Sequence, residues 1–182
     1  QLALIQANYL KSLLQTAHNQ LDVEISVIST RGDRSQKDNI ALSEIGGKGL
    51  FTAEIESQLL SGDIDMAVHS AKDMPTALPD GLALVCYPER ENVADAFIAV
   101  NYANFGSLPD NAVIGSASLR RRALMWRKRP DLNMVMFRGN VDTRLEKVNR
   151  GEVDATLLAC AGLNRMKKSG SITEMLDIDD FP

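Results

Sequence analysis

The chain has 182 residues, 45% of them hydrophobic, which is enough for one ordinary domain or two small ones. Its 20 Lys and Arg residues against 24 Asp and Glu give a formal net charge of −4. This argues against a general nucleic-acid-binding protein, because such proteins are usually basic. No run approaches about 18 consecutive apolar residues, and no basic segment followed by an apolar core opens the chain, so the sequence predicts neither a membrane span nor an export signal.

The first half of the chain alternates helical and strand patterns. Apolar residues at near-helical spacing predict helices, and strict alternation of apolar and polar residues predicts strands. The predicted elements are a helix over 2–20, a strand over 21–29, a helix through Ile55 and Leu59 that stops near Gly62, and strands over 64–68 and 82–87.

The second half follows the same alternation. Strands are predicted over 96–100, 112–115 and 133–137, and the run VDATLLACAG predicts one more strand and a turn. One helix should present Leu119, Ala123 and Trp126 on a single face, and another should bury Val141, Leu145 and Val148.

Strands that alternate with helices of about 10 residues predict parallel sheets covered on both faces. We therefore expect an α/β protein with two small domains, residues 1–88 and 95–182, joined by a short hinge over 89–94.

Three turns in the second half carry glycine, hydroxyl or amide groups together with arginine: SASLRRR (116–122), RGNVDTR (138–144) and AGLNR (161–165). Residues 116–144 hold eight basic and two acidic side chains, a local charge of 8 − 2 = +6 in a chain of net −4. Ligands of open α/β sheets bind beyond the carboxyl ends of the strands, and free N–H groups at helix starts favour anions there. The pattern predicts an anion-binding site.

Arg120 and Arg121 open a helix, where cations oppose the helix dipole, so they are candidates for anion binding or else are solvated charges. Ser116 or Ser118 either caps this helix, contacts the ligand, or does both. The later basic residues of the helix, Arg122, Arg127, Lys128 and Arg129, are typical of a solvated face.

Gly139 indicates a backbone position that needs positive φ or a close approach to a ligand. Its neighbour Arg138 is a candidate for carboxylate binding, and Arg144 and Arg165 are weaker candidates. Lys48 lies between glycines in GGKG, which could bring it against a ligand, but the spacing is not that of a P-loop.

The stretch HSAKDMP (69–75) follows the predicted strand over 64–68, so Lys72 and Asp73 should lie on a loop at the carboxyl end of a strand. They form either an ordinary surface ion pair or part of an active site, where an ionised Asp73 stabilises a cation that forms on the substrate. His69 is more typical of a structural histidine. Two cysteines in apolar runs, Cys86 and Cys160, predict buried free thiols in a reducing cytosol, and no spacing indicates a metal site.

Five motifs in this order over nearly the whole chain resemble the porphobilinogen deaminase (hydroxymethylbilane synthase) family: EIGGKGLF, DMAVHSAKDMPT, SLRRRAL, FRGNVDTRL and ATLLACAGLNR. The resemblance implies two domains similar to type II periplasmic binding proteins with a cleft between them. It also implies a third, α+β domain that is absent from this chain. The implied reaction deaminates four porphobilinogen molecules and joins them head to tail into hydroxymethylbilane, in tetrapyrrole (haem) biosynthesis.

The resemblance also implies roles for single residues. Asp73 matches the catalytic aspartate, and Ser116 matches a substrate-binding position that lines the same cleft. Arg138, Arg144 and Arg165 match residues that bind substrate carboxylates. The implied cofactor contacts are Lys48, Lys72, Ser118, Arg120, Arg121, Arg138, Gly139, Arg144 and Arg165.

The family carries a dipyrromethane cofactor on a cysteine of the third domain, and neither Cys86 nor Cys160 corresponds to that cysteine. We therefore expect a cytoplasmic, monomeric enzyme whose first domain is incomplete here, and we expect the chain alone to be inactive. Glu44 and Ala117 depart from residues found in some members. The alternative from another class is a non-catalytic α/β module that binds an anion or a solute.

Overall fold

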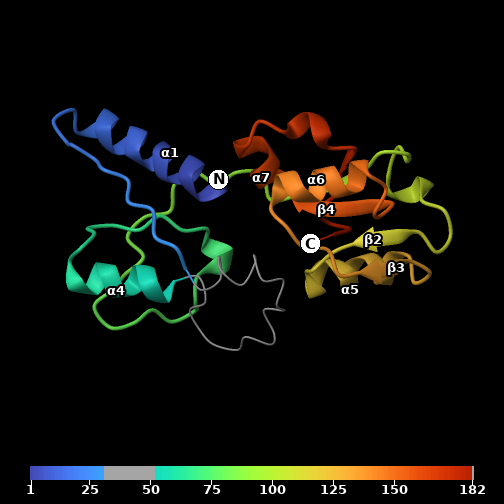
Figure 1. The fold of residues 1–182 in the computed structure, drawn as a ribbon, viewed down its shortest axis with the longest axis horizontal. Helices are drawn as coiled ribbons and strands as arrows, with labels where there is room; N and C mark the ends of the chain where they lie inside the picture. Colours follow the sequence, from blue (N-terminus) through green and yellow to red (C-terminus); the bar gives the residue numbers. More distant parts are fainter. Residues whose placement is uncertain (31–51, 182) are drawn as a thin grey trace. The chain divides into compact units, whose positions relative to one another are not determined.

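The computed structural model describes residues 1–30 and 52–181 (Figure 1). The chain forms two compact units, Gln1–Pro88 and Glu89–Pro182, which are described separately. The predictions made for Lys48 and Glu44 fall outside the described residues.

The first unit contains helices α1 (Leu2–Ala17) and α4 (Ala53–Ser61) and the short 3-10 helix η1 (Ala71–Asp73). Both predicted helices are confirmed. Helix α4 carries Glu54 and Glu56 in its first turn, where negative charge complements the helix dipole. It ends at Gly62, whose left-handed φ of 78° lets its N–H bond to the carbonyls of Gln58 and Leu59.

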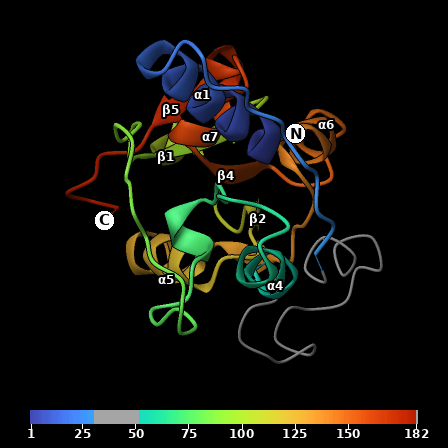
Figure 2. The ribbon, with the colours of Figure 1, turned by 90° about the vertical axis from the view of Figure 1, so that its left-hand side faces the viewer.

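The three strands predicted for the first unit are wrong. The structure forms no strand over residues 21–29, 64–68 or 82–87. Figure 2 draws these three segments without arrows. Alternation favours an extended backbone, but a strand also needs a neighbour to complete its hydrogen-bond ladder. The apolar side chains of these segments are largely exposed, as Val27 (75%) and Val85 (83%) show, so neither pairing nor burial holds the segments as strands.

The second unit is built on one open five-stranded sheet in the order β3-β2-β4-β1-β5. The strands are β1 (Asp95–Ala99), β2 (Val113–Gly115), β3 (Asn133–Val135), β4 (Ala155–Ala159) and β5 (Glu174–Met175). The helices are α5 (Leu119–Lys128), α6 (Val141–Asn149) and α7 (Cys160–Arg165), with 3-10 turns η2 (Phe105–Ser107) and η3 (Ser169–Ser171). The strands and helices predicted for this half are confirmed within a few residues.

The prediction of a parallel sheet is confirmed for only part of the sheet. Strand β2 runs parallel to β3 and β4, but β1 runs antiparallel to β4 and β5. Parallel neighbours need a crossover helix between them. No α-helix joins β1 to β2, since the segment between them contains only the η2 turn. Strand β4 then inserts between these two strands.

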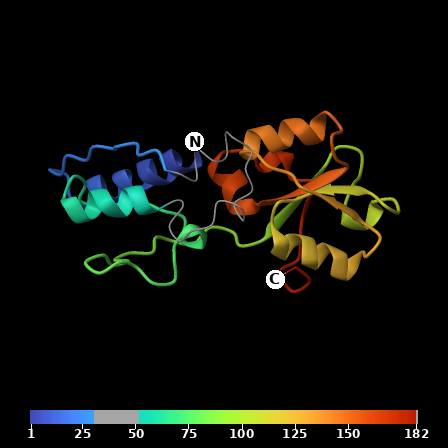
Figure 3. The ribbon, with the colours of Figure 1, turned by 60° about the horizontal axis from the view of Figure 1, so that its bottom comes forward.

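The sheet is covered on both faces, as predicted. Helices α6 and α7 pack on one face with Ala96 and Ile98, and α5 packs on the other with Phe97. Figures 1 and 3 show α5 and α6 on opposite sides of the sheet. Successive side chains of β1 point to opposite faces of the sheet, so this strand contributes to two hydrophobic cores.

The predicted buried face of α5 is wrong in part. Leu119 and Trp126 are 78% and 42% exposed, whereas Met125 is fully buried. Trp126 lies at the helix edge because its indole N–H donates to the carbonyl of Leu132 at 2.9 Å. The Arg122 guanidinium lies 5.2 Å from the centre of the Trp126 ring. This cation–π contact favours a half-exposed position for the ring.

Both cysteines are free thiols, as predicted, but only Cys160 is buried. Cys86 is exposed because its segment, 82–87, lies on the surface of the first unit rather than in a buried strand. Burial raises the pKa of the Cys160 thiol, which keeps it protonated.

Candidate functional site

The turns predicted to bind anions gather at one edge of the sheet in the second unit. Since β2, β3 and β4 are parallel, their carboxyl ends lie at the same edge. These ends lead into α5, α6 and α7 respectively. Strand β1 is antiparallel, so its first residue, Asp95, lies at this edge too, opposite Ala159, the last residue of β4. We call this the arginine edge.

The turn after β2 is held by its two serines. Ser116 is buried, its N–H donates to the carbonyl of Val135 at 3.0 Å, and its hydroxyl accepts the N–H of Ser118 at 3.2 Å. The hydroxyl of Ser118 accepts the N–H of Arg121 at 3.4 Å and caps α5. The capping alternative from the sequence is therefore confirmed for Ser118, and it orients the start of α5 towards this edge.

Arg120 and Arg121 share one carboxylate, that of Asp95. Arg121 makes a two-pronged pair with it, Nε to Oδ2 at 2.9 Å and Nη2 to Oδ1 at 2.6 Å, and Arg120 donates from Nη2 to Oδ2 at 2.9 Å. The side chains of Asp95 and Arg121 are 7% and 15% exposed, against 54% for Arg120. Arg121 is thus built into the edge and Arg120 reaches into solvent.

Asp95 was missed by sequence reasoning. The sequence places it at the end of a polar break, with no sign of a basic partner. Only the antiparallel direction of β1 puts it among the arginines, and that direction is not visible in the pattern of apolar residues.

The turn after β3 contains Arg138 and Gly139, as predicted from the RGN motif. Gly139 has a φ of 129°, a conformation that favours glycine, and a Cβ there would meet the Thr143 side chain at 2.8 Å. Asn140 caps α6 by accepting the Thr143 N–H at 2.8 Å. Arg144 then donates from Nε to the carbonyl of Gly139 at 2.8 Å.

Arg144 lies close enough to Arg121 and Arg138 to be affected by both. Burial lowers the pKa of the Arg144 guanidinium, and the charges of Arg121 and Arg138 lower that pKa further. A buried cation beside two other cations is destabilised, and a bound anion relieves this. Arg138 lies in the turn after β3, and Arg121 and Arg144 lie in the first turns of α5 and α6, so the arginine edge is suited to a ligand with more than one carboxylate.

Arg165 is placed differently. It lies in the last turn of α7, and its charge is one cause of the lowered pKa of Glu91. The larger causes are hydrogen bonds that the Glu91 carboxylate accepts, first from the Asn92 N–H and then from the Asn164 side chain at 3.1 Å. The structure therefore links Arg165 to Glu91, a residue that the sequence did not single out.

Lys72 and Asp73 lie in the first unit, on η1, and both are exposed. The turn is closed by the Asp73 N–H, which donates to the carbonyl of Ser70 at 2.9 Å. The Ser70 hydroxyl in turn donates to the Gln6 side chain of α1 at 3.0 Å. The turn that carries Asp73 is therefore fixed to a helix rather than to the strand predicted before it.

The basic residues at the end of α5 and just after it lie away from this edge. Arg127 is exposed, and Lys128 pairs with Asp180 near the chain end. Arg129 is only 23% exposed and makes a two-pronged pair with Asp131, so the solvated face predicted from the sequence does not extend to it.

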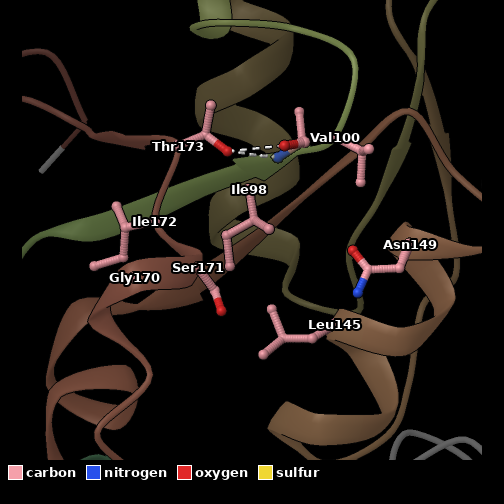
Figure 4. A pocket seen from close by; sticks show the side chains of 9 residues that line it. Ile98, Val100, Leu145, Asn149, Gly170, Ser171, Ile172 and Thr173 are labelled. Atoms are coloured by element: carbon pink, nitrogen blue, oxygen red, sulfur yellow. Dashed lines mark hydrogen bonds between the residues drawn. The ribbon is translucent and has the colours of Figure 1, made fainter.

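A cavity of about 230 Å³ lies at the opposite edge of the sheet (Figure 4). It is bordered by Ile98, Leu145 and Asn149 and by the η3 segment, where the Thr173 hydroxyl exchanges hydrogen bonds with the backbone of Ala99. Its lining carries no charged side chain, so it offers nothing for a carboxylate.

Over residues 1–30 and 52–181 the structure contains no group of three His, Cys, Asp or Glu side chains that could hold a metal ion. No described helix is both long and apolar enough to cross a bilayer.

Comparison with known proteins identifies the family. The family model described as porphobilinogen deaminase, dipyromethane cofactor binding domain, matches residues 1–182. The chain belongs to this family. It is 49% identical over 178 residues to the porphobilinogen deaminase of Sulfurimonas denitrificans and 49% identical over 179 residues to that of Geobacter sulfurreducens. Each alignment covers 98% of the chain but only 56% and 55% of these porphobilinogen deaminases, so the chain spans about half their length.

Proposed function

We propose that this chain supplies the cofactor- and substrate-binding part of a porphobilinogen deaminase (hydroxymethylbilane synthase), a transferase of tetrapyrrole biosynthesis. The whole enzyme would deaminate porphobilinogen and join four molecules head to tail, releasing ammonia. The observation that carries this proposal is that the segments with Arg121, Arg138 and Arg144 follow the carboxyl ends of the parallel strands β2 and β3, in a chain that matches a cofactor-binding family model over its full length.

The charge of the substrate explains the arginines. Each porphobilinogen brings an acetate and a propionate, so the growing product is a polyanion. Arg138, Arg144, Arg165 and Ser116 are the proposed contacts to these groups. Each charge-assisted hydrogen bond contributes about 1.5–3 kcal/mol, and guanidinium groups match carboxylates in a two-pronged geometry.

Asp73 is the proposed catalytic residue. An ionised carboxylate near the pyrrole nitrogen stabilises the positive charge that develops on the substrate as ammonia leaves. Its position on a turn whose backbone is tied to α1 through Ser70 and Gln6 supports this role, because the residue is then presented from a fixed backbone.

The donor set of the arginine edge fits a dipyrromethane, which carries carboxylates of the same kind. The proposed contacts are Lys48, Lys72, Ser118, Arg120, Arg121, Arg138, Gly139, Arg144 and Arg165. When bound, the group supplies the pyrrole carbon to which the first substrate is joined. We propose that it is attached to a cysteine of a further domain rather than to Cys86 or Cys160. For Cys160, burial of the thiol opposes thioether formation; for Cys86 the proposal rests on the resemblance to the family alone.

The larger architecture belongs to the same proposal. It consists of two domains of the type II periplasmic-binding-protein kind, residues 1–88 and 95–182, a hinge over 89–94, an interdomain cleft and a third domain outside this chain. The half-length match to the relatives supports the third domain alone. We further propose that the enzyme is a cytoplasmic monomer and that this chain alone turns over no porphobilinogen.

The first experiment separates binding from turnover. The purified chain is titrated with porphobilinogen by calorimetry and then incubated with it while ammonia release is measured. Saturable binding without ammonia release is expected. Absence of binding contradicts the proposed site, and ammonia release at an enzymatic rate contradicts the proposed inactivity of the chain alone.

The second experiment tests Asp73. The chain is joined to the remaining portion of the Sulfurimonas denitrificans enzyme, and Asp73→Asn is compared with the unchanged chimera. Loss of a preorganised charge should lower kcat by about 100-fold or more, while KM changes little because the carboxylate-binding arginines are intact. A matched variant, Asp80→Asn, removes an equally exposed carboxylate of the same unit and should leave kcat unchanged.

A further inference from the structure

We infer that Asp95 is a positioning residue that orients Arg121 for the ligand's carboxylates, so that one acidic side chain strengthens an anion site. This inference rests on the proposed function, because it concerns the same arginine edge. It goes beyond that function by assigning a role to a residue of opposite charge.

The first step is the geometry of Arg121. A guanidinium has five N–H donors in one plane. Arg121 uses Nε and Nη2 on the two oxygens of Asp95, at 2.9 and 2.6 Å, and Nη1 on the carbonyl of Leu157 at 3.2 Å. Three donors are then fixed and two remain. Since the group is planar, fixing three donors also fixes the directions of the other two.

The second step is the rigidity of the support. Asp95 is the first residue of β1, is 6% exposed and is paired in register with Ala159 of β4. Leu157 is also in β4, so both acceptors of Arg121 belong to adjacent, hydrogen-bonded strands of the sheet. The long Arg121 side chain is therefore held by two paired strands of the sheet, and the cost of ordering it is met on folding rather than on binding.

The third step is charge. Arg121 and Arg138 both act on Arg144, and Arg121 forms its ion pair with Asp95. Without this pair, the repulsion between Arg121 and Arg144 would tend to move the two cations apart. Asp95 keeps one of them in place and also binds Arg120 through Oδ2. The carboxylate thus sets the spacing at which a multivalent anion finds its partners.

The direction of the effect separates positioning from simple charge. Asp95→Asn removes one negative charge beside the site, so Coulomb attraction alone predicts tighter binding of an anion. Positioning predicts weaker binding, because Arg121 must then be ordered by the ligand. The expected loss is about tenfold, the usual cost of immobilising one flexible side chain on binding.

The experiment is a calorimetric titration of the chain with porphobilinogen for the wild type and for Asp95→Asn, Asp95→Glu and Asp131→Asn. Asp131 provides the matched control. It accepts two hydrogen bonds from Arg129, at 2.8 and 2.7 Å, in the same two-pronged geometry, and this pair lies outside the arginine edge. Asp131→Asn should keep the wild-type affinity, whereas Asp95→Asn should lose it and Asp95→Glu should recover part of it. Equal or tighter binding by folded Asp95→Asn overturns the inference.

Two further readouts keep the test decisive. If Asp95→Asn does not fold, Asp95→Glu alone decides. It preserves the charge, so unchanged affinity contradicts positioning and a severalfold loss supports it. The Nε–H resonance of Arg121 is measured by NMR without ligand. Slow exchange of this proton with water in the wild type, together with fast exchange in the Asp95 variant, supports positioning even if porphobilinogen does not bind. A failure of porphobilinogen to bind would instead refute the proposed function. An exchange rate unaffected by the substitution overturns the inference.

Discussion

The Nε–H of Arg144 donates to the backbone carbonyl of Gly139 at 2.8 Å. A side chain from the first turn of α6 thereby closes back on the turn that leads into its own helix. The remaining guanidinium donors of Arg144 are directed from a fixed base, in a setting where burial and two neighbouring cations lower its pKa. The contact links the local backbone of the RGN turn to the electrostatics of the arginine edge.

Replacing Arg144 should weaken ligand binding more than its loss of charge alone explains. Arg144→Met removes one charge-assisted contact, worth about 1.5–3 kcal/mol, so affinity for porphobilinogen should fall by about 10- to 100-fold. Arg144→Lys should not restore it, because lysine has no Nε–H to hold the Gly139 carbonyl and no planar fork.

Calorimetric titration measures this effect, with Arg127→Met as the control. Arg127 is an exposed arginine of α5 that donates to the Asp180 backbone carbonyl at 3.2 Å. If Arg127→Met weakens binding as much as Arg144→Met, general charge rather than the arginine edge governs affinity.

Gly139→Ala should destabilise the second unit by about 1–3 kcal/mol. Its φ of 129° is unfavourable for alanine, and the new Cβ would meet the Thr143 side chain at 2.8 and 2.9 Å. Urea unfolding followed by the fluorescence of the single tryptophan, Trp126, reports this unit. Gly170→Ala is the matched control, since a Cβ there meets nothing within 4 Å. Equal urea midpoints for Gly139→Ala and Gly170→Ala would show that the Gly139 turn adjusts to the added Cβ without loss of stability.

The packing of α5 makes a prediction that opposes the sequence pattern. Met125 is fully buried and Leu119 is 78% exposed. Met125→Ala should cost about 2–5 kcal/mol, because it leaves a cavity beneath the helix, whereas Leu119→Ala should change stability by less than about 0.5 kcal/mol. The same urea experiment compares them. A larger loss for Leu119→Ala would mean that the face predicted from the sequence is the buried one after all.

The Arg129–Asp131 pair predicts a pH dependence of stability. The Arg129 guanidinium lowers the pKa of the Asp131 carboxyl from 3.8 to about 2. Because the folded pKa lies below the unfolded one, the stabilisation is complete above about pH 4 and is lost as pH falls towards 2. The difference in urea midpoint between wild type and Asp131→Asn should therefore shrink over that range.

Asp110→Asn controls for general charge effects, because Asp110 lies 3.5 Å from the same arginine but is 92% exposed. It should show little difference from wild type at any pH. A wild-type minus Asp131→Asn difference that stays constant from pH 4 to pH 2 would contradict the lowered pKa.

Much of the second unit could be predicted because its signals are local. The start of α6 follows from Asn140, and the β-strands follow from short apolar runs. The gathering of the arginine turns also follows, since it requires only that β2, β3 and β4 be parallel. These features depend on a few neighbouring residues or on a general rule of α/β sheets.

The features that were not predicted depend on partners distant in the sequence. The direction of β1, and with it the contact of Asp95 with Arg121, is decided by pairing with β4 some 60 residues later. The segments 21–29, 64–68 and 82–87 alternate like strands, but alternation does not supply a neighbouring strand. On α5, helical periodicity alone could not show whether Met125 or Trp126 would face the sheet.

The reversed direction of β1 also has a mechanical consequence. The backbone arriving from Pro88 enters the sheet at Asp95, so the peptide connection between the two units ends on the residue that holds Arg121. A pull or twist along that connection reaches Asp95 before any other residue of the sheet. Had β1 run parallel to its neighbours, the connection would have entered the sheet at the opposite edge, beside the uncharged cavity and away from Arg121.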